Sequence, residues 1–240
     1  MSQAELGEVY VLDLDLAMSF HLVKENEGNL RRYGALLASG NSKVRLTGTA
    51  DEEDLWEQHI VDCGALVSLL PRGARVIDVG TGGGLPGMVW ALCRSDVGVT
   101  LLDSVGKKCA AVEEMARMMG LEPHRVQVVC SRSEEFARLN REVYDVACAR
   151  ALSEAPVLAE LLSPLVAVGG MVWAMKGPRC EEELAPGEGR WGELGLSDPE
   201  VLDYDLGDRH RKLVIWRKIS PCPDRYPRRP GMAEKRPWYR

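Results

Sequence analysis

Apolar residues recur along this chain in short runs that alternate with longer stretches of helical spacing. From residue 74 onward, short β-branched runs typical of buried strands are separated by segments with apolar residues at three- and four-residue steps. This alternation predicts a doubly wound (Rossmann-like) α/β fold with a seven-stranded sheet. Residues 207–210 are too few for a parallel crossover, so the last two strands should form an antiparallel hairpin. The predicted strands are 75–79, 99–102, 126–130, 144–149, 171–175, 201–206 and 212–216, and the predicted helices are 86–93, 107–119, 134–139 and 156–165.

The N-terminal part of the chain shows helical spacing without strand alternation. Apolar residues at helical steps predict one helix over residues 6–20 and a second over 30–37, with a break at Gly28-Asn29. A third, longer helix should begin at Asp51, whose side chain can cap it. We therefore divide the chain into an N-terminal helical cap (1–72), a central α/β domain (73–218) and a basic, proline-rich C-terminal tail (219–240).

Composition narrows the class of protein. The chain has 240 residues, of which 45% are hydrophobic, enough for one α/β core with a small extension. No run approaches the length of a membrane span and no basic-then-apolar leader is present, so we expect a soluble, cytoplasmic protein. We also expect a monomer. The 7 cysteines are scattered and never form Cys-x-x-Cys, which argues against a disulfide framework and a zinc site. We predict no metal.

Charge is distributed unevenly. Residues 209–240 contain 11 Lys or Arg and two acids, whereas the preceding residues contain 19 Lys or Arg and 34 acids. A basic end on an acidic body favours docking of a polyanion near the C-terminus. The tail has too few apolar residues for a core of its own, so we expect it to be extended and mobile, with Arg228 and Arg229 available to RNA. Packing of the tail onto the acidic body is the alternative.

Residues 181–197 are the least ordered stretch that we expect inside the central domain. They are rich in Gly, Glu and Pro, and we interpret them as a surface loop with at most one helical turn.

The most informative stretch is a glycine-rich turn that follows the first predicted strand. Glycines at 80, 82, 83, 84 and 87 let the backbone turn sharply and approach a ligand closely. The spacing Gly82-x-Gly84-x-x-Gly87 formally matches a dinucleotide fingerprint, but Pro86 occupies a position where a phosphate-binding helix should offer N–H donors. The carboxylate of Asp78 would repel a pyrophosphate and suits a cationic ligand. The pattern Asp-x-Gly-x-Gly-x-Gly that begins at Asp78 resembles the first motif of the class I methyltransferases, whose cofactor is S-adenosylmethionine. Thr81 belongs to the same turn.

Other candidate residues follow the later strands. Asp103 ends the second strand, where a carboxylate can accept both ribose hydroxyls of NAD or of S-adenosylmethionine. Ser133 and Glu134 follow the third strand, and they can hold an adenine edge or simply cap a helix. His59 and Asp62 share a helix face, and we interpret them as a surface pair rather than a catalytic one.

Several blocks together resemble the RsmG (GidB) family. They are Gln58-His-Ile-Val-Asp62, Ile77-Asp-Val-Gly-Thr-Gly-Gly-Gly-Leu-Pro-Gly87, Thr100-Leu-Leu-Asp-Ser-Val-Gly-Lys-Lys108, Ser131-Arg-Ser-Glu-Glu-Phe136, Ala149-Arg-Ala151, Ala174-Met-Lys-Gly177 and Asp208-Arg-His210. The resemblance implies the class I methyltransferase fold and transfer of a methyl group from S-adenosylmethionine to N7 of one guanine in 16S ribosomal RNA, free or in the small subunit. The chain departs from the family's pattern around Asn41 and at Gly83. With the turn residues above, the predicted cofactor-binding set is Asp78, Gly80, Thr81, Gly82, Leu85, Asp103, Ser133, Glu134 and Arg150.

The implied reaction needs no catalytic base, because guanine N7 carries a lone pair and no proton. Alignment of the two reactants can supply most of the acceleration, with Arg150 and Lys176 as positioning candidates. Two other functions remain open: a NAD-dependent oxidoreductase, and a non-catalytic S-adenosylmethionine-binding ribosome assembly factor. The predicted RNA-binding residues are Lys107, Lys108, Arg132, Lys176, Arg209, Arg228 and Arg229.

Overall fold

One mixed sheet forms the centre of the molecule. The structure is a computed structural model that describes residues 14–240, and within these residues seven strands pair in the order β3-β2-β1-β4-β5-β7-β6. The five strands from β3 to β5 are parallel, whereas β7 pairs antiparallel with both β5 and β6. The strands are β1 (Arg75–Val79), β2 (Gly98–Asp103), β3 (Val126–Cys130), β4 (Tyr144–Arg150), β5 (Val166–Lys176), β6 (Glu200–Leu206) and β7 (Arg209–Arg217).

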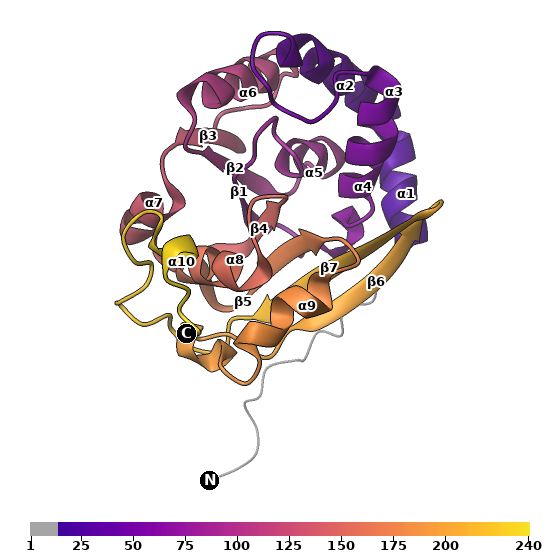
Figure 1. The fold of residues 1–240 in the computed structure, drawn as a ribbon. Helices are drawn as coiled ribbons and strands as arrows, with labels where there is room; N and C mark the ends of the chain where they lie inside the picture. Colours follow the sequence, from indigo (N-terminus) through magenta and orange to yellow (C-terminus); the bar gives the residue numbers. More distant parts are fainter. Residues whose placement is uncertain (1–13) are drawn as a thin grey trace.

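Helices cover both faces of the sheet (Figure 1). Residues that alternate along one strand point to opposite faces, so Val76 belongs to one apolar cluster and Ile77 to the other. The N-terminal helices share the first cluster with the sheet and with Trp90, whose indole N–H donates to the carbonyl oxygen of Cys63 at 2.8 Å. The helices of this face are α1 (Leu16–Glu25), α2 (Glu27–Asn41), α3 (Glu52–Leu55), α4 (Val61–Gly64), α5 (Gly87–Cys93) and α6 (Gly106–Met118).

The opposite face carries the later helices and the C-terminal tail. Figure 1 shows α8, α9 and the yellow tail on the same side of the sheet. The ring of Trp191 packs there against those of Trp216 and Trp238, with centroid distances of 5.2 and 5.6 Å respectively. The helices of this face are α7 (Ser133–Leu139), α8 (Ala155–Leu162), α9 (Cys180–Leu184) and α10 (Met232–Lys235).

The predicted strands are confirmed, with the largest differences in β5 and β7. Strand β5 begins five residues before the predicted start at Met171, and β7 begins at Arg209 rather than at Lys212. Gly169 and Gly170 lie inside β5, and the predicted strand begins only after them because glycine is rare in strand interiors. Gly169 has φ +90°, and a Cβ atom on Gly170 would lie 2.6 Å from the carbonyl oxygen of Asp145. The glycines therefore permit a close, irregular pairing, which a search for β-branched residues misses.

The N-terminal helices differ from the prediction in where they break. The break falls at Asn26, whose side-chain amide donates to the Leu22 carbonyl oxygen, while Gly28 and Asn29 lie inside α2. The predicted helix over residues 6–20 lies mostly outside the described residues. Asp51 caps α3 as predicted, accepting hydrogen bonds from the N–H groups of Glu53 and Asp54. The helix continues through a π-helical turn at Trp56–Ile60 into α4.

The tail is not extended, so that prediction is wrong. Trp238 is 6% exposed and its indole N–H donates to the Pro156 carbonyl oxygen at 2.8 Å. Arg228 forms a two-pronged ion pair with Glu160, at 2.7 and 2.5 Å, and this glutamate is only 1% exposed. Tyr226, which is 5% exposed, is buried in the same way, and burying the rings of Tyr226 and Trp238 stabilises the packed tail by removing apolar surface from water.

Residues 181–197 also differ from the prediction. They contain most of α9, and two further single helical turns follow it, at Ala185–Gly187 and Trp191–Leu194. Trp191 and Leu194 are buried, so the second half of this stretch packs into the apolar cluster that contains Ile77 rather than forming a surface loop.

Candidate cofactor site

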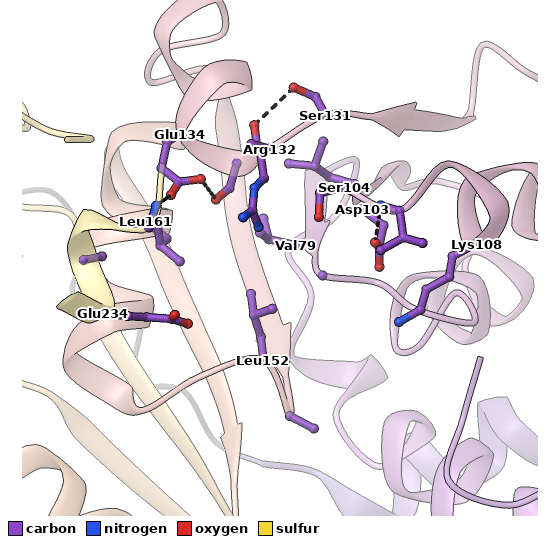
Figure 2. A pocket seen from close by; sticks show the side chains of 17 residues that line it. Val79, Asp103, Ser104, Lys108, Ser131, Arg132, Glu134, Leu152, Leu161 and Glu234 are labelled. Carbon is purple, nitrogen blue, oxygen red and sulfur yellow. Dashed lines mark hydrogen bonds between the residues drawn. The ribbon is translucent and has the colours of Figure 1, made fainter. Parts of the chain in front are cut away.

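Two adjoining cavities open at the carboxyl ends of the parallel strands, the edge at which doubly wound sheets bind ligands. The first has a volume of about 320 Å³ and the second about 340 Å³, and Gly80, Lys108 and Ala151 line both. Figure 2 shows the first cavity with its labelled side chains. The first brings together the predicted residues Gly80, Asp103, Ser133 and Glu134, and the second Thr81, Gly82, Leu85 and Arg150.

The glycine loop between β1 and α5 forms the wall that the two cavities share. Gly80, Gly82 and Gly84 have φ values of +73°, +57° and +98°, which side chains rarely adopt. A Cβ atom on Gly80 would also lie 2.7 Å from the Cδ1 atom of Leu152, whose side chain lines the first cavity. Glycine at these positions therefore keeps both the turn and the cavity.

Asp78 lies beneath the loop, so the prediction that it contacts a cofactor is corrected. Its residue is fully buried, and its Oδ2 atom accepts from the Thr81 hydroxyl at 2.7 Å and from the Gly87 N–H at 2.9 Å. Among residues 14–240 its Oδ1 atom has no hydrogen-bond partner. Burial raises its pKa from 3.8 to about 6, although the two hydrogen bonds oppose this. The Asp78 side chain thus stabilises the conformation of the loop from beneath.

Asp103 joins the two sides of the first cavity. Its Oδ2 atom accepts from the Gly82 N–H at 3.0 Å and its Oδ1 atom from the Val105 N–H at 2.9 Å. Each carboxylate oxygen has a further lone-pair direction, which leaves acceptor capacity for ribose hydroxyls. Asp103 therefore fits the predicted role, and it also holds the glycine loop in place.

Ser133 and Glu134 begin α7 at the other end of the first cavity. The Ser133 hydroxyl donates to Glu134 Oε2 at 3.2 Å, so it does not act as a side-chain cap. Glu134 Oε1 accepts from the N–H of Gly231, in the C-terminal tail, at 2.8 Å. The carboxylate that sequence analysis assigned to an adenine edge is thus already engaged by the chain itself.

Arg150 lies where the second cavity meets a third, of about 350 Å³. Its Nη1 atom lies 3.0 Å from Nδ1 of His59 and 3.4 Å from Oδ2 of Asp62, and Arg211 reaches the other oxygen of Asp62 at 3.1 Å. Burial, and then the charge of Arg150, lowers the pKa of His59 to about 4. At neutral pH this site thus contains a neutral imidazole between fixed arginines. Our interpretation of His59 and Asp62 as a surface pair is wrong, because both face Arg150.

The predicted RNA-binding cations fall into two groups. Lys107 and Arg132 are exposed, and Lys108 lines both cavities. Lys176 instead donates to the Ser153 carbonyl oxygen and to Glu183, each at 2.6 Å, and Arg209 donates to the Glu57 carbonyl oxygen at 2.7 Å. Arg228 is held by Glu160 as described above, whereas Arg229 is exposed. Lys176, Arg209 and Arg228 therefore have structural partners that compete with RNA.

Several cavity-lining residues escaped sequence analysis. Arg45, Leu46 and Thr47, from the loop after α2, line the second cavity, and the tail contributes Gly231, Ala233 and Glu234 to the first. The π-helical turn that carries His59 is a feature frequent at functional sites, but it has no sequence signature. For the tail, the only signal in the sequence was the distribution of charge, and for the loop it was the departure from the family's pattern around Asn41.

Neither a metal centre nor a membrane span is apparent in the described part of the chain. Among residues 14–240, no group of three or more His, Cys, Asp or Glu is arranged to hold a metal ion. Over the same residues, no helix is long and apolar enough to pass through a bilayer.

The loop geometry distinguishes between the two nucleoside cofactors. A pyrophosphate needs free N–H groups at the start of the helix after the loop. Here the Gly87 N–H is bonded to a carboxylate, and those of Gly84 and Leu85 donate to the Thr81 carbonyl oxygen at 2.8 and 3.0 Å. The loop thus offers little to a phosphate, while the cavity with Asp103 at its side fits the nucleoside and amino-acid parts of S-adenosylmethionine. The NAD alternative is disfavoured.

Known proteins resemble the chain in both sequence and fold. The family model described as rRNA small subunit methyltransferase G (GidB) matches residues 26–211. The ribosomal RNA small subunit methyltransferase G of Symbiobacterium thermophilum is 40% identical over 213 residues, which cover 84% of this chain and 86% of the relative. The protein of the same name from Deinococcus radiodurans is 38% identical, over 90% of this chain and 87% of the relative.

Solved structures show the same fold at low sequence identity. The S-adenosylmethionine-dependent methyltransferase SibL, in its apo form, has a TM-score of 0.55 and 17% identity, covering 70% of this chain and 57% of its own. TrmN from Thermus thermophilus has a TM-score of 0.50 and 20% identity, covering 67% of this chain and 49% of its own. The predicted class I methyltransferase fold is thereby confirmed. The sequence match over most of the chain goes further, and the chain belongs to the rRNA small subunit methyltransferase G family.

Proposed function

We propose that the protein transfers a methyl group from S-adenosylmethionine to N7 of a guanine in 16S ribosomal RNA. Family membership supports an rRNA methyltransferase of the small subunit. The observation that carries the cofactor assignment is the start of α5, where Asp78 engages the Gly87 N–H beside a cavity bordered by Asp103. Because the proposed substrate is ribosomal RNA, we expect the protein to act in the cytoplasm.

The chemistry asks little of the side chains beyond positioning. When bound, the cofactor supplies a methyl group activated by its sulfonium. The N7 lone pair forms the new N–C bond, the sulfur retains the electron pair of the broken S–C bond, and no proton leaves the base. A site without a free general base suffices, and the low pKa of His59 leaves that side chain neutral rather than cationic. Alignment of the two reactants then supplies most of the acceleration.

Arg150 is the best positioned group for orienting the base. Its guanidinium is fixed by His59 and Asp62, and its side chain is 16% exposed. Arginine is the commonest donor to the O6 and N7 edge of guanine, although a hydrogen bond to N7 itself would block the lone pair. We therefore assign Arg150 to O6 or to the carboxylate of the cofactor. Lys107, Lys108 and Arg132 border the same edge and are proposed to contact RNA phosphates.

A methylation assay tests this proposal. The purified protein is incubated with S-adenosylmethionine and with small subunits, or naked 16S rRNA, from a strain that lacks the endogenous enzyme. N7-methylguanine is then mapped by borohydride and aniline cleavage. We expect one new cleavage site that depends on protein and cofactor. Methyl transfer to another atom would contradict the N7 assignment, while cofactor binding without any transfer would favour the non-catalytic assembly factor.

A further inference from the structure

The C-terminal tail supplies part of the cofactor cavity. Gly231, Ala233 and Glu234 line the first cavity together with Asp103 and Glu134. In Figure 2, Glu234 projects from the α10 side of the cavity, opposite Asp103 and Lys108. These tail residues lie beyond residue 211, where the match to the family model ends.

The tail is held against the cavity by several specific contacts. Both carboxylate oxygens of the buried Glu160 accept hydrogen bonds from the Arg228 guanidinium, and the Trp238 indole N–H donates to the Pro156 carbonyl oxygen. Between these two anchors, the Gly231 N–H donates to Glu134 at 2.8 Å, and Ala233, 3% exposed, packs in an apolar cluster with α8. Breaking a buried ion pair of this kind leaves an unpaired charge, so segment 228–238 is a fixed wall rather than a loosely placed end.

The three acids that line the cavity have different partners. Both oxygens of Asp103 accept from backbone N–H groups, and both oxygens of Glu134 accept from Gly231 and Ser133. Within residues 14–240, Glu234 makes no hydrogen bond or ion pair with its side chain, although it faces the cavity. It is the lining carboxylate that remains available to a ligand.

We propose that tail residues 231–234 form the adenine end of the cofactor site, and that the Glu234 carboxylate accepts a hydrogen bond from the 6-amino group of adenine. This rests on the proposed function, since it takes S-adenosylmethionine as the ligand. Asp103 lies on the opposite side, as expected if it accepts from the ribose. A carboxylate favours a 6-amino purine over a 6-oxo purine, because an oxo group offers no donor and repels the charge. The tail therefore selects the base of the cofactor.

Binding of two purine analogues tests this role. S-adenosylhomocysteine and S-inosylhomocysteine, which differ at the 6-position, are titrated by calorimetry into the full-length protein, Glu234→Gln and Lys235→Gln. Lys235 is an exposed neighbour that does not line the cavity, so Lys235→Gln is the matched control. We expect wild type and the control to prefer the adenosyl compound. Glu234→Gln should reduce that preference by about three- to tenfold, the worth of one hydrogen bond, because glutamine can also donate to the oxo group.

The outcomes separate this proposal from the cofactor assignment itself. An unchanged preference in Glu234→Gln, with tight binding of the adenosyl compound, would overturn the role of the tail and leave the proposed function standing. Failure of the wild-type protein to bind either compound would overturn both. Hydrogen exchange provides a second measurement: S-adenosylhomocysteine should slow exchange in residues 228–236 of the wild-type protein, and equal exchange with and without it would contradict the proposal.

Discussion

Asp103 is the side chain on which cofactor affinity should depend most strongly. Asp103→Asn places an amide N–H₂ where a carboxylate oxygen now faces the N–H of Gly82 or Val105. It also removes a charged acceptor from the cavity, so we expect the free energy of cofactor binding to weaken by about 1–3 kcal/mol. Calorimetry with S-adenosylmethionine measures this. The exposed Asp198, changed to Asn, is the control, and equal affinity of both variants would show that Asp103 does not bind the cofactor.

Asp78 should give the free energy of unfolding a distinctive pH dependence. Its pKa rises from 3.8 to about 6 on folding because its carboxylate is buried. The folded state therefore binds the proton of Asp78 more tightly than the unfolded state does, and ionisation of the buried carboxyl group destabilises the folded state. This loss of stability is absent below pH 3.8 and complete above pH 6. We expect wild type to lose on the order of 3 kcal/mol relative to Asp78→Asn as pH rises across this window, because a pKa difference of one is worth about 1.4 kcal/mol.

Urea titrations of both proteins without cofactor, at intervals between pH 4 and 7, measure this difference. Other effects of the substitution, such as altered hydrogen bonds to Thr81 and Gly87, do not follow this titration, so only the change of the stability difference with pH bears on the buried charge. Parallel curves would show that Asp78 is not perturbed in the free protein.

Among the structural elements, the glycine loop should be the least tolerant of side chains. Gly82→Val places a β-branched residue at φ +57°, with its Cβ atom 3.2 Å from the carbonyl oxygen of Leu46. The strain, about 1–3 kcal/mol, can be relieved only by moving the loop, so cofactor binding should be abolished while the sheet remains folded. Circular dichroism and calorimetry measure the two effects. Gly28→Val, in a helix with no neighbouring atom within 4 Å, is the control.

Elements whose local pattern agrees with their final contacts were predictable from the sequence. The predictions of strand β1 and of the glycine turn after it were correct, because β-branched residues favour strands and glycine favours sharp turns whatever the distant contacts are. The early start of β5 could not be predicted, because glycine has a low strand propensity. Gly170 fits there because the nearby Asp145 carbonyl oxygen leaves no room for a Cβ atom. Likewise Trp191 lies in a Gly- and Glu-rich stretch, yet it is buried by Trp216 and Trp238, which are distant in sequence.

The same limit applies to the candidate site. Asp103 and Gly80 follow strands, so topology alone brings them to one edge of the sheet. The sequence also predicts that Asp78 lies next to the glycine turn. It does not predict that the side chain points beneath the loop, because that direction depends on the contacts with Thr81 and Gly87. The tail residues at the cavity were beyond reach, because their position depends on Arg228 meeting Glu160, a pairing over 68 residues of sequence.

At the scale of the whole molecule, the tail should contribute to stability. Trp238→Ala removes a ring that contacts Trp191 and Tyr239 and a hydrogen bond to Pro156. Loss of a buried tryptophan typically costs about 3–5 kcal/mol, so urea denaturation should begin at clearly lower concentration. Ile219→Ala, at a side chain that is 59% exposed in the same tail, should change stability by less than about 0.5 kcal/mol. Equal stability of the two variants would restore the picture of a mobile tail.

The hairpin of β6 and β7 also ties the last part of the central sheet to the first helices. Arg209 donates to Glu57 across 152 residues of sequence, and Arg211 to Asp62 across 149. During synthesis, residues 57–62 therefore leave the ribosome long before β7, the strand that supplies these two arginines, and they lack these contacts meanwhile. We expect nascent chains that end at residue 199 to be cut by protease within residues 56–64 more readily than chains that extend through β7. The π-helical turn beside the cavities would thus gain its last contacts only after most of the sheet has been synthesised.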